Sequence, residues 1–368
     1  MIKIAERLRP FSHESGVFVL LPGSSFRLQV FPQGIVVEDL LGPVPLLLAN
    51  IEIPVTGPVR EFTVQQDLEK GCVRIWGFEK QGFFRYELYS TTDCKGILFH
   101  LQKGREEAPL VSGKWSLAYI SQNNQQIFIG PSNEDVSSKK PYNVPLIERL
   151  SLGNNKAQDW SLIHRRKQME EILPLWHRLG QFIPLSCQND NALGASLFGK
   201  SRDALLSLNR QEAFSFLHDL FSAGFEGALS PRLIDQERQG IFSGPLSSAD
   251  SPLYLLTEGA RFIRSLFIQE HHSLVSLFPK LPSEFHCGRF INVPCGNGGV
   301  LNMEWTKKAP RRISFVAGTD QNIAFLLPRD QVRCRFRTSP VDKGIVYQSG
   351  SPMQVSAKQT YWLDNFQK

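Results

Sequence analysis

Three carboxylate residues stand close together in the stretch SAGFEGALSPRLIDQERQGIF: Glu226, Asp235 and Glu237. Paired carboxyl groups perform inverting glycoside hydrolysis, in which one group protonates the leaving oxygen and the other activates water, at a separation of ~6.5–9.5 Å. Glu226 lies between Gly224 and Gly227, in a predicted loop just after a helix. We take Glu226 as the candidate general acid and Asp235 or Glu237 as the candidate base. The alternative interpretation is a solvated loop between helices.

A second group has the residue types of a sugar-binding site. Such sites combine aromatic walls with a few polar groups that fix the orientation of the ligand. Trp160 and Trp176 have Gln158, Asp159 and His177 beside them in the sequence. On a straight helix this spacing places both indoles close to one face. The alternative is that the two tryptophans pack linker helices against an N-terminal sheet.

Metal and phosphate chemistry is disfavoured. The metal-capable residues of the C-terminal half are His271, His272, His286, Cys287 and Cys295. They lack the Cys-x(2–4)-Cys and His-x(3–5)-His spacings of structural zinc sites. The run CGNGG at 295–299 lacks the Lys-Ser/Thr of a phosphate loop and precedes a strand, so it predicts a turn. We predict no metal site and no cofactor.

The net charge of +6 is concentrated near the C-terminus, where residues 281–368 contain 12 basic and 6 acidic side chains. Arg333, Arg335 and Arg337 alternate, so on a strand all three emerge on one face of the sheet. Such a surface can meet an anionic partner. Aromatic residues are scarce there, which disfavours nucleic acid. The alternative is a solvated edge that discourages strand pairing.

The elements that position these residues change character along the chain. Short alternating strands bounded by turn residues fill positions 16–130 and predict a β-sandwich. After a polar linker ending at Pro141, helical periodicity covers LIERLSL and AQDWSLIHRRKQMEEILPLWHRLG, with a kink or break at Pro174. A further helix is expected from Ser201 as cap to Gly224 as stop. Another helix is expected over 253–278, and strands return from Phe290.

The segment FPKLPSEFHCGRFINVPCGNGGVLNMEW, with its Leu-Pro pair, turn glycines and closing Trp305, resembles a known domain junction. It is similar to the place where the helical barrel of inverting α-L-fucosidases, and of related α/α-barrel glycoside hydrolases, meets a C-terminal β-sandwich. The resemblance covers about the last quarter of the chain, and the β–α–β order agrees with it. No catalytic motif of the family is matched residue by residue.

The resemblance implies a multidomain α and β protein in four parts. We expect an N-terminal β-sandwich at 1–136, linker helices at 137–180, a helical segment at 181–280 and a C-terminal β-sandwich at 281–368. The family's barrel has twelve helices, and residues 145–279 have room for roughly half of them at ~11–12 residues each. An incomplete α/α barrel favours a non-catalytic, carbohydrate-associated protein. The alternatives are an inverting glycoside hydrolase and an interaction module that binds an anionic partner through its basic C-terminal face.

The composition of the chain indicates the general class of protein and where it works in the cell. A hydrophobic content of 42% with 26 Phe is typical of a globular protein. The longest apolar runs, Val17 to Leu21 and Ile323 to Leu327, are far shorter than the ~18 residues that span a bilayer. The N-terminal MIKIAERLRPF carries charges where a signal peptide needs an apolar core. We therefore expect a cytoplasmic protein without membrane contact, in which the six cysteines are free thiols.

Overall fold

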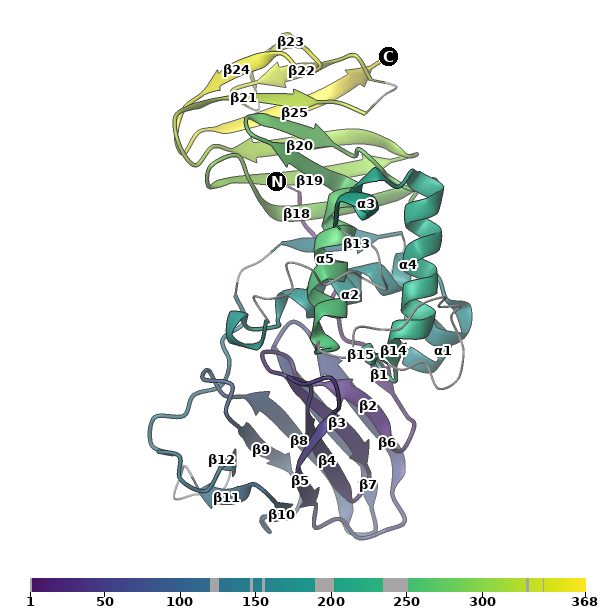
Figure 1. Ribbon diagram of the computed structural model, residues 1–368, viewed down its shortest axis with the longest axis vertical. Coiled ribbons are helices and arrows are strands. Elements are labelled where there is room, and N and C mark those ends of the chain that lie inside the picture. The colour runs from purple at the N-terminus through teal and green to yellow at the C-terminus, as the bar shows by residue number, and fades with distance from the viewer. Residues whose placement is uncertain are drawn as a thin grey trace.

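The chain is described here by a computed structural model. The described residues are 2–119, 126–145, 148–153, 156–188, 202–233, 251–328, 331–339 and 341–368. Figure 1 shows the N-terminal sheets at one end of the long axis, the helices in the middle and the C-terminal sheets at the other end. The predicted order of strands, helices and strands, with both α and β parts, is confirmed.

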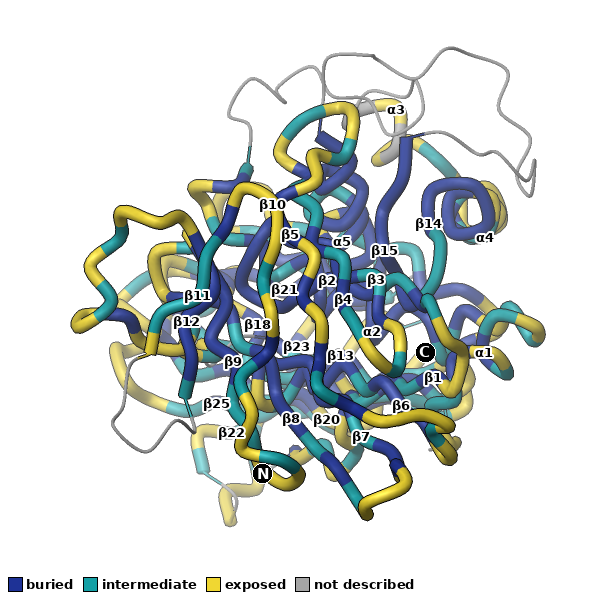
Figure 2. The backbone as a smooth tube through the Cα atoms, turned by 90° about the horizontal axis from the view of Figure 1, so that it is seen from below, coloured by how far each residue is buried: buried dark blue, intermediate teal, exposed yellow. Residues whose placement is uncertain are grey.

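Within the described residues, the N-terminal strands form a seven-stranded sheet in the order β1-β6-β7-β8-β9-β12-β11 and a five-stranded sheet in the order β10-β5-β4-β3-β2. The strands are β1 (Phe11–Ser12), β2 (Val17–Leu20), β3 (Phe26–Phe31), β4 (Gly34–Asp39), β5 (Leu46–Glu52), β6 (Arg60–Asp67), β7 (Cys72–Glu79), β8 (Gly82–Ser90), β9 (Ile97–Lys103), β10 (Leu110–Gly113), β11 (Ser116–Tyr119) and β12 (Gln126–Gly130). Alternate residues of both sheets, among them Val30, Val37, Ile75 and Leu88, belong to one hydrophobic cluster. The buried stretches of these strands are dark blue in Figure 2.

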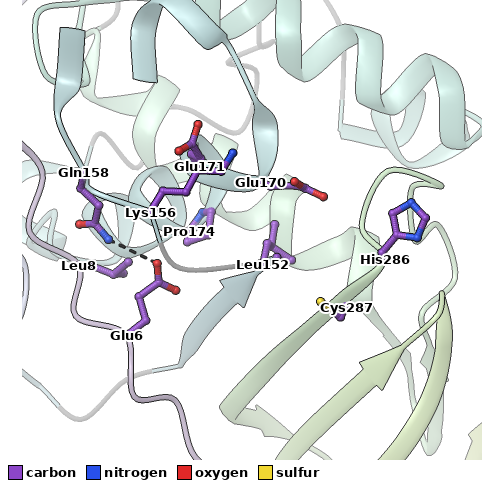
Figure 3. A pocket seen from close by; sticks show the side chains of 11 residues that line it. Glu6, Leu8, Leu152, Lys156, Gln158, Glu170, Glu171, Pro174, His286 and Cys287 are labelled. Carbon is purple, nitrogen blue, oxygen red and sulfur yellow. Dashed lines mark hydrogen bonds between the residues drawn. The ribbon is translucent and has the colours of Figure 1, made fainter. Parts of the chain in front are cut away.

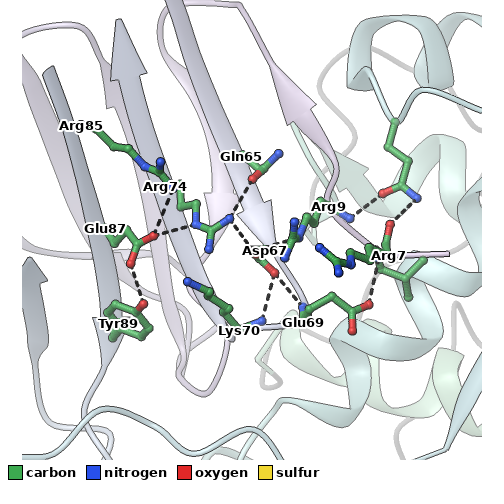
Figure 4. A network of polar contacts seen from close by, with 12 residues as sticks. Arg7, Arg9, Gln65, Asp67, Glu69, Lys70, Arg74, Arg85, Glu87 and Tyr89 are labelled. Atoms are coloured by element: carbon green, nitrogen blue, oxygen red, sulfur yellow. Dashed lines mark hydrogen bonds and ion pairs between the residues drawn. The ribbon is translucent and has the colours of Figure 1, made fainter. Parts of the chain in front are cut away.

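The N-terminal segment, residues 2–10, contacts the N-terminal sheet through an ion pair between Arg9 and Asp67. Figure 4 shows Arg9 beside Asp67 at the end of β6, where Arg9 Nε lies 3.0 Å from Asp67 Oδ2. Arg74 Nη1 reaches the same oxygen at 2.7 Å, and its Nε donates to Glu87 Oε1 at 2.7 Å. Asp67 is completely buried. A buried carboxylate needs charged or hydrogen-bonding partners, and Arg9 and Arg74 are two of the partners that stabilise Asp67 in the core.

The helices of the described chain are α1 (Trp160–Arg166), α2 (Met169–Gln181), η1 (Leu185–Cys187), α3 (Arg202–Ser207), α4 (Arg210–Gly224) and α5 (Leu253–Phe267). The predicted break at Pro174 is wrong, because Pro174 lies inside α2 and the helices separate at Lys167, a left-handed residue with φ 49°. The helix expected up to Gly224 does end there. The stretch forms two helices instead of one, because α3 ends at Ser207 and Asn209 caps a new helix, α4, through the backbone N–H groups of Gln211 and Glu212. Ser201, the expected cap, lies outside the described residues.

Two stretches that were predicted as helix are strands. β13 (Arg149–Leu152) replaces the end of the LIERLSL helix and pairs with β18. Residues 268–277 form the hairpin β16 (Ile268–His271) and β17 (Leu274–Leu277), which turns at His272 with φ 54°. In both cases alternate apolar residues fill a sheet face, and pairing with strands distant in sequence prevails over local helical periodicity.

The C-terminal strands of the described residues form a seven-stranded sheet, β13-β18-β19-β20-β25-β22-β23, and a four-stranded sheet, β16-β17-β21-β24. The strands not yet given are β18 (Cys287–Cys295), β19 (Gly299–Thr306), β20 (Ala309–Val316), β21 (Gln321–Leu326), β22 (Arg333–Arg337), β23 (Ile345–Gln348), β24 (Pro352–Val355) and β25 (Thr360–Gln367). Their buried faces share one cluster with the helices. The helical layer and the C-terminal sheets therefore have a common core.

Helices α2 and α5 approach each other closely inside this core. A Cβ at Gly180 would lie 2.3 Å from the Leu256 carbonyl oxygen, and one at Gly259 would lie 2.5 Å from the Trp176 ring. Only glycine fits at these two contacts. In the described part of the chain, we find no helix with the length and apolar character needed to cross a lipid bilayer.

Candidate functional site

Glu226, the predicted general acid, faces the N-terminal sheet. It lies in β14 (Phe225–Glu226), which pairs with β15 (Ser230–Pro231) directly after α4. Glu226 Oε1 accepts a hydrogen bond from Arg27 Nη1, and Arg27 also pairs with Glu38 at 2.7 Å. A carboxyl oxygen of the candidate general acid is thus bonded to an arginine, which favours the ionised carboxylate over the protonated acid. The other two predicted carboxylates, Asp235 and Glu237, lie outside the described residues.

The two tryptophans of the predicted sugar site are part of the core. Trp160 is 4% exposed and Trp176 is completely buried. The Trp176 ring packs edge-on against Phe225 with 4.7 Å between centroids, and its Nε1 donates to the Leu255 carbonyl oxygen at 3.1 Å. The Trp160 ring contacts Phe221. Both tryptophans are thus core residues, and these contacts join them to α4, β14 and α5, whereas the alternative interpretation expected contacts with the N-terminal sheet.

The polar neighbours of these tryptophans also have structural partners. Asp159 is the N-cap of α1 and accepts a hydrogen bond from the Leu162 backbone N–H at 3.2 Å. His177 is 1% exposed, and its Nε2 lies 3.0 Å from Glu148 Oε1. The structure thus brings His177 to a buried carboxylate that no motif in the sequence had singled out.

Glu148 joins the helical layer to the C-terminal sheet. Its second oxygen accepts from Arg264 Nε at 3.1 Å, and Arg264 continues to Glu270 at 3.0 Å and to the Pro294 carbonyl oxygen at 2.6 Å. Burial alone would raise the pKa of Glu148. The hydrogen bond to His177 and the charge of Arg264 outweigh it, so that the pKa lies below its ordinary value.

A cavity of about 280 Å³, which we call the junction pocket, lies where four segments of the chain meet. Figure 3 shows its lining side chains, with Glu6 and Gln158 at one side and His286 and Cys287 at the other. The lining residues are Glu6, Leu8, Leu152, Gly153, Lys156, Gln158, Glu170, Glu171, Pro174, His286 and Cys287. They come from the N-terminal segment, the β13–α1 connection, the first turns of α2 and the start of β18.

Several polar groups of the junction pocket are held by neighbours. Ser151 Oγ donates to Glu6 Oε2 at 2.9 Å, and Gln158 Nε2 donates to the Arg7 carbonyl oxygen at 3.0 Å. Arg166 binds both oxygens of Glu171, at 2.7 and 2.8 Å. These bonds fix the walls of the pocket in one arrangement, so that it is largely preformed.

Glu170 is a half-buried carboxylate that lines the junction pocket, and its oxygens can accept hydrogen bonds from a ligand. It is the second residue of α2, where the helix dipole stabilises negative charge. Within the described residues its side chain makes no hydrogen bond or ion pair, and neither does the exposed imidazole of His286. The pocket therefore offers an acceptor carboxylate and an imidazole that can donate or accept, which suits a polyhydroxylated ligand.

The remaining sequence expectations concern metals and turns. Among the described residues, no three His, Cys, Asp or Glu side chains come together in a way that could hold a metal ion. The CGNGG run forms the turn between β18 and β19, as predicted, with Gly299 N–H donating to the Gly296 carbonyl oxygen at 3.1 Å. All six cysteines are free thiols.

Glu170 and the pocket itself were not predicted from the sequence, and His286 was considered only as a possible metal ligand. These residues are more than a hundred positions apart, and the pocket exists because β13 pairs with β18 beside the start of α2. Comparison with models of known protein families and with curated proteins finds no match to this chain.

Proposed function

We propose that this chain is a non-catalytic carbohydrate-binding protein, a shortened relative of the α/α-barrel glycoside hydrolases. In this proposal it keeps an N-terminal and a C-terminal β-sandwich and part of the helical barrel between them. The sandwich interpretation is supported by the single cluster that both N-terminal sheets line and by the alternation of its residues. The partial-barrel interpretation is supported by the few helices that lie between the sheets in the described residues.

The observation that carries the proposal is the junction pocket with the Glu170 carboxylate. Its volume of about 280 Å³ is near the ~300 Å³ lower limit of small-molecule pockets, so the ligand is a small molecule or the end of a chain. A carboxylate accepts hydrogen bonds from two hydroxyl groups at once, as adjacent hydroxyls of a sugar ring provide. His286 can bond a further hydroxyl from the opposite wall.

Three carboxylates other than Glu170 are each bonded to a neighbouring side chain, which favours ligand binding over hydrolysis. Inverting hydrolysis needs one carboxyl group that donates a proton and a second that activates water. Glu171 is bonded by Arg166, and Glu226 by Arg27. Glu6 accepts from Ser151. Each of these carboxylates thus serves as an acceptor for a fixed neighbour within the protein.

Saturation-transfer NMR with neutral monosaccharides, L-fucose and D-galactose, tests the proposal. The wild-type protein is expected to give saturation transfer to at least one of them, and Glu170→Ala is expected to lose it. Glu106→Ala is the matched control, because Glu106 is an exposed glutamate in the β9–β10 loop, away from the pocket. Equal signals from the wild type and Glu170→Ala, or none from the wild type, would contradict the proposal.

A further inference from the structure

The outer face of the C-terminal seven-stranded sheet carries a row of charged residues. Arg289, Glu304, Arg312, Asp364 and Arg335 are successive Cα partners across β18, β19, β20, β25 and β22. Directly opposed residues point to the same side of a sheet. Their neighbours in the chain are buried in the core: Phe290, Trp305, Ile313, Leu363 and Phe336. The charged row therefore faces away from the core.

Three arginines of this row and its flank surround one carboxylate. Glu304, whose side chain is only 4% exposed, accepts from Arg312 Nε at 2.8 Å and from Arg289 Nε at 3.3 Å. Arg311, the extra residue of a bulge in β20, lies 3.9 Å away. These arginine side chains are 45–59% exposed. Glu304 thus orients the guanidinium groups from below, and much of their donor surface faces solvent.

The second carboxylate, Asp364, holds two more arginines. Arg335 Nε donates to its Oδ1 at 2.7 Å, and Arg337 bonds its Oδ2. This confirms for Arg335 and Arg337 the prediction that alternate arginines of β22 share one sheet face. Five arginines and two carboxylates leave three positive charges (5 − 2 = 3) on the surface that we call the arginine face.

A half-buried indole stands beside the arginine face on the same side of the sheet. Trp362 lies two residues before Asp364 on β25, is the partner of Arg337 on β22, and is the partner of Ser314 on β20. Ser314 Oγ in turn accepts from Asn302 Nδ2 at 3.3 Å. The surface thus combines an aromatic platform and hydroxyl and amide groups with oriented cations.

We propose that the arginine face, together with Trp362, binds an anionic polysaccharide, a chain of sugar rings that carry carboxylate or sulfate groups. Guanidinium groups bond such planar or tetrahedral anions through two parallel N–H donors. Arg289, Arg312 and Arg335 occupy every second strand, and with ~4.8 Å between strands their backbones repeat at ~10 Å. That repeat suits acidic groups on alternate sugar rings.

A single aromatic platform distinguishes this surface from one for nucleic acid. Proteins that bind single strands stack successive bases on several aromatic rings along a basic groove. The arginine face is a sheet surface on which Trp362 stands next to Asn302 and Ser314, groups that bond sugar hydroxyls. The inference rests on the proposed carbohydrate association for its choice of a sugar chain, but its residues are separate from the junction pocket.

The test uses the full chain and hyaluronan oligosaccharides, which carry a carboxylate on alternate rings, with neutral dextran as the uncharged comparison. Hyaluronan is expected to bind with an affinity that falls as salt rises. Arg289→Gln combined with Arg335→Gln is expected to weaken it by about tenfold or more, because charge-assisted hydrogen bonds are lost. The matched control combines Arg60→Gln with Arg165→Gln, exposed arginines of β6 and α1, and is expected to change affinity by less than about twofold.

Two further variants keep the test decisive if the glutamine pair disturbs the sheet. Trp362→Ala is expected to weaken hyaluronan binding without a change in net charge, and Arg289→Lys combined with Arg335→Lys is expected to retain the salt dependence. The inference would be overturned if the two glutamine pairs lost the same affinity for hyaluronan, or if dextran bound as tightly as hyaluronan. Tighter binding of an oligothymidylate of equal charge would overturn it as well. Glu170→Ala is expected to leave hyaluronan binding unchanged, so a failure of the pocket and a failure of this face are separable.

Discussion

Arg27 on β3 and Glu226 in β14 are bonded to each other, although 199 positions separate them in the chain. Arg27 also donates Nε to Glu38 at 2.8 Å, and its guanidinium lies 4.5 Å from the centre of the Phe18 ring. Beside this pair, the Ala228 N–H donates to the Phe18 carbonyl oxygen at 2.8 Å. The segment after α4 is thereby docked on the N-terminal sheet.

Removing the arginine of this pair is expected to cost more stability than altering its carboxylate. Arg27→Ala removes a cation that is bonded to two carboxylates and is expected to lower the free energy of unfolding by ~2 kcal/mol, because the arginine side chain is only 9% exposed. Glu226→Gln keeps an acceptor oxygen and is expected to cost ~1 kcal/mol. Urea denaturation measures both, with Glu106→Gln as the exposed control. An Arg27→Ala midpoint equal to that of the control would show that the pair adds nothing.

The same glutamine variant decides between binding and catalysis. If Glu226 were a general acid, Glu226→Gln would abolish turnover while the protein stayed folded. We expect no turnover of 4-nitrophenyl glycosides by either the wild type or the variant, because Glu226 is the counter-ion of Arg27. Turnover by the wild type that disappears in the variant, with an unchanged circular dichroism spectrum, would establish the hydrolase alternative.

Gly227 is expected to be intolerant of a side chain. Its φ is +49°, and a Cβ there would lie 2.4 Å from the Phe18 carbonyl oxygen. Gly227→Ala therefore adds a clash with backbone to the strain of a left-handed residue, and we expect a loss of ~2 kcal/mol or more in the free energy of unfolding. Gly298→Ala is the matched control, since Gly298 has φ +80° and open space around its Cβ position.

For that control we expect only the ~1 kcal/mol of backbone strain. Thermal denaturation of the two variants gives the comparison. The docking of the 225–231 segment on β2 predicts that Gly227→Ala is the less stable of the two. The opposite order would mean that this segment does not contact Phe18 as described.

The sequence predicted the β–α–β order because its signals are local. The alternation of the N-terminal strands and the helical periodicity of α2 can each be seen in a short stretch of sequence, and both predicted the right kind of element. The helix prediction for residues 268–277 was wrong because the deciding contact is not local. The apolar residues of this stretch satisfy a helical pattern as well as an alternating one, and only pairing of β17 with β21, far away in the chain, decides between them.

The candidate sites were harder to predict than the elements. Trp160 and Trp176 have the residue type of a sugar platform, but burial depends on which helices lie over them, and no local pattern reports this. Glu170 and His286 form opposite walls of one pocket only after β13 has paired with β18. The arginine face was partly foreseen, because alternation along β22 is local, whereas its partners on β18 and β20 follow from sheet order.

Glu148 is expected to make stability depend on pH in the acid range. Burial acts to raise its pKa, but His177 and Arg264 lower it below the value of an unfolded glutamate, ~4.3. A depressed folded pKa means that the stabilisation is complete above the unfolded pKa and is lost as the pH falls through the folded pKa. Glu148→Gln is therefore expected to lower the urea midpoint at about pH 7 and to approach the wild type in strong acid.

The control for Glu148 is the exposed Glu106→Gln, whose difference from the wild type is expected to be small at every pH. A constant difference between the wild type and Glu148→Gln, from neutral pH down to about pH 3, would contradict the assigned role, because a carboxylate bonded to His177 and Arg264 must lose that contribution on protonation.

Cys187 is expected to be the more reactive member of a thiol pair. It lies in η1 beside Cys94 of the β8–β9 loop, and stabilisation of its thiolate by the Cys94 thiol lowers the pKa of Cys187, while the same interaction raises the pKa of Cys94. A lowered pKa gives more thiolate at neutral pH, and the thiolate is the form that displaces iodide from iodoacetamide. Cys94→Ala removes the donor, so alkylation of Cys187 at about pH 7 is expected to slow by about tenfold for each unit by which its pKa rises.

Mass spectrometry of the Cys187 peptide gives the alkylation rate, and Cys287→Ala is the control because Cys287 belongs to the junction pocket, away from this pair. At about pH 10, above the ordinary thiol pKa of ~8.5, the wild type and Cys94→Ala are expected to react at similar rates, since both then carry the thiolate. A Cys187 rate at neutral pH that is unchanged in Cys94→Ala would show that the two thiols are not bonded, because removal of the donor must change the fraction of thiolate.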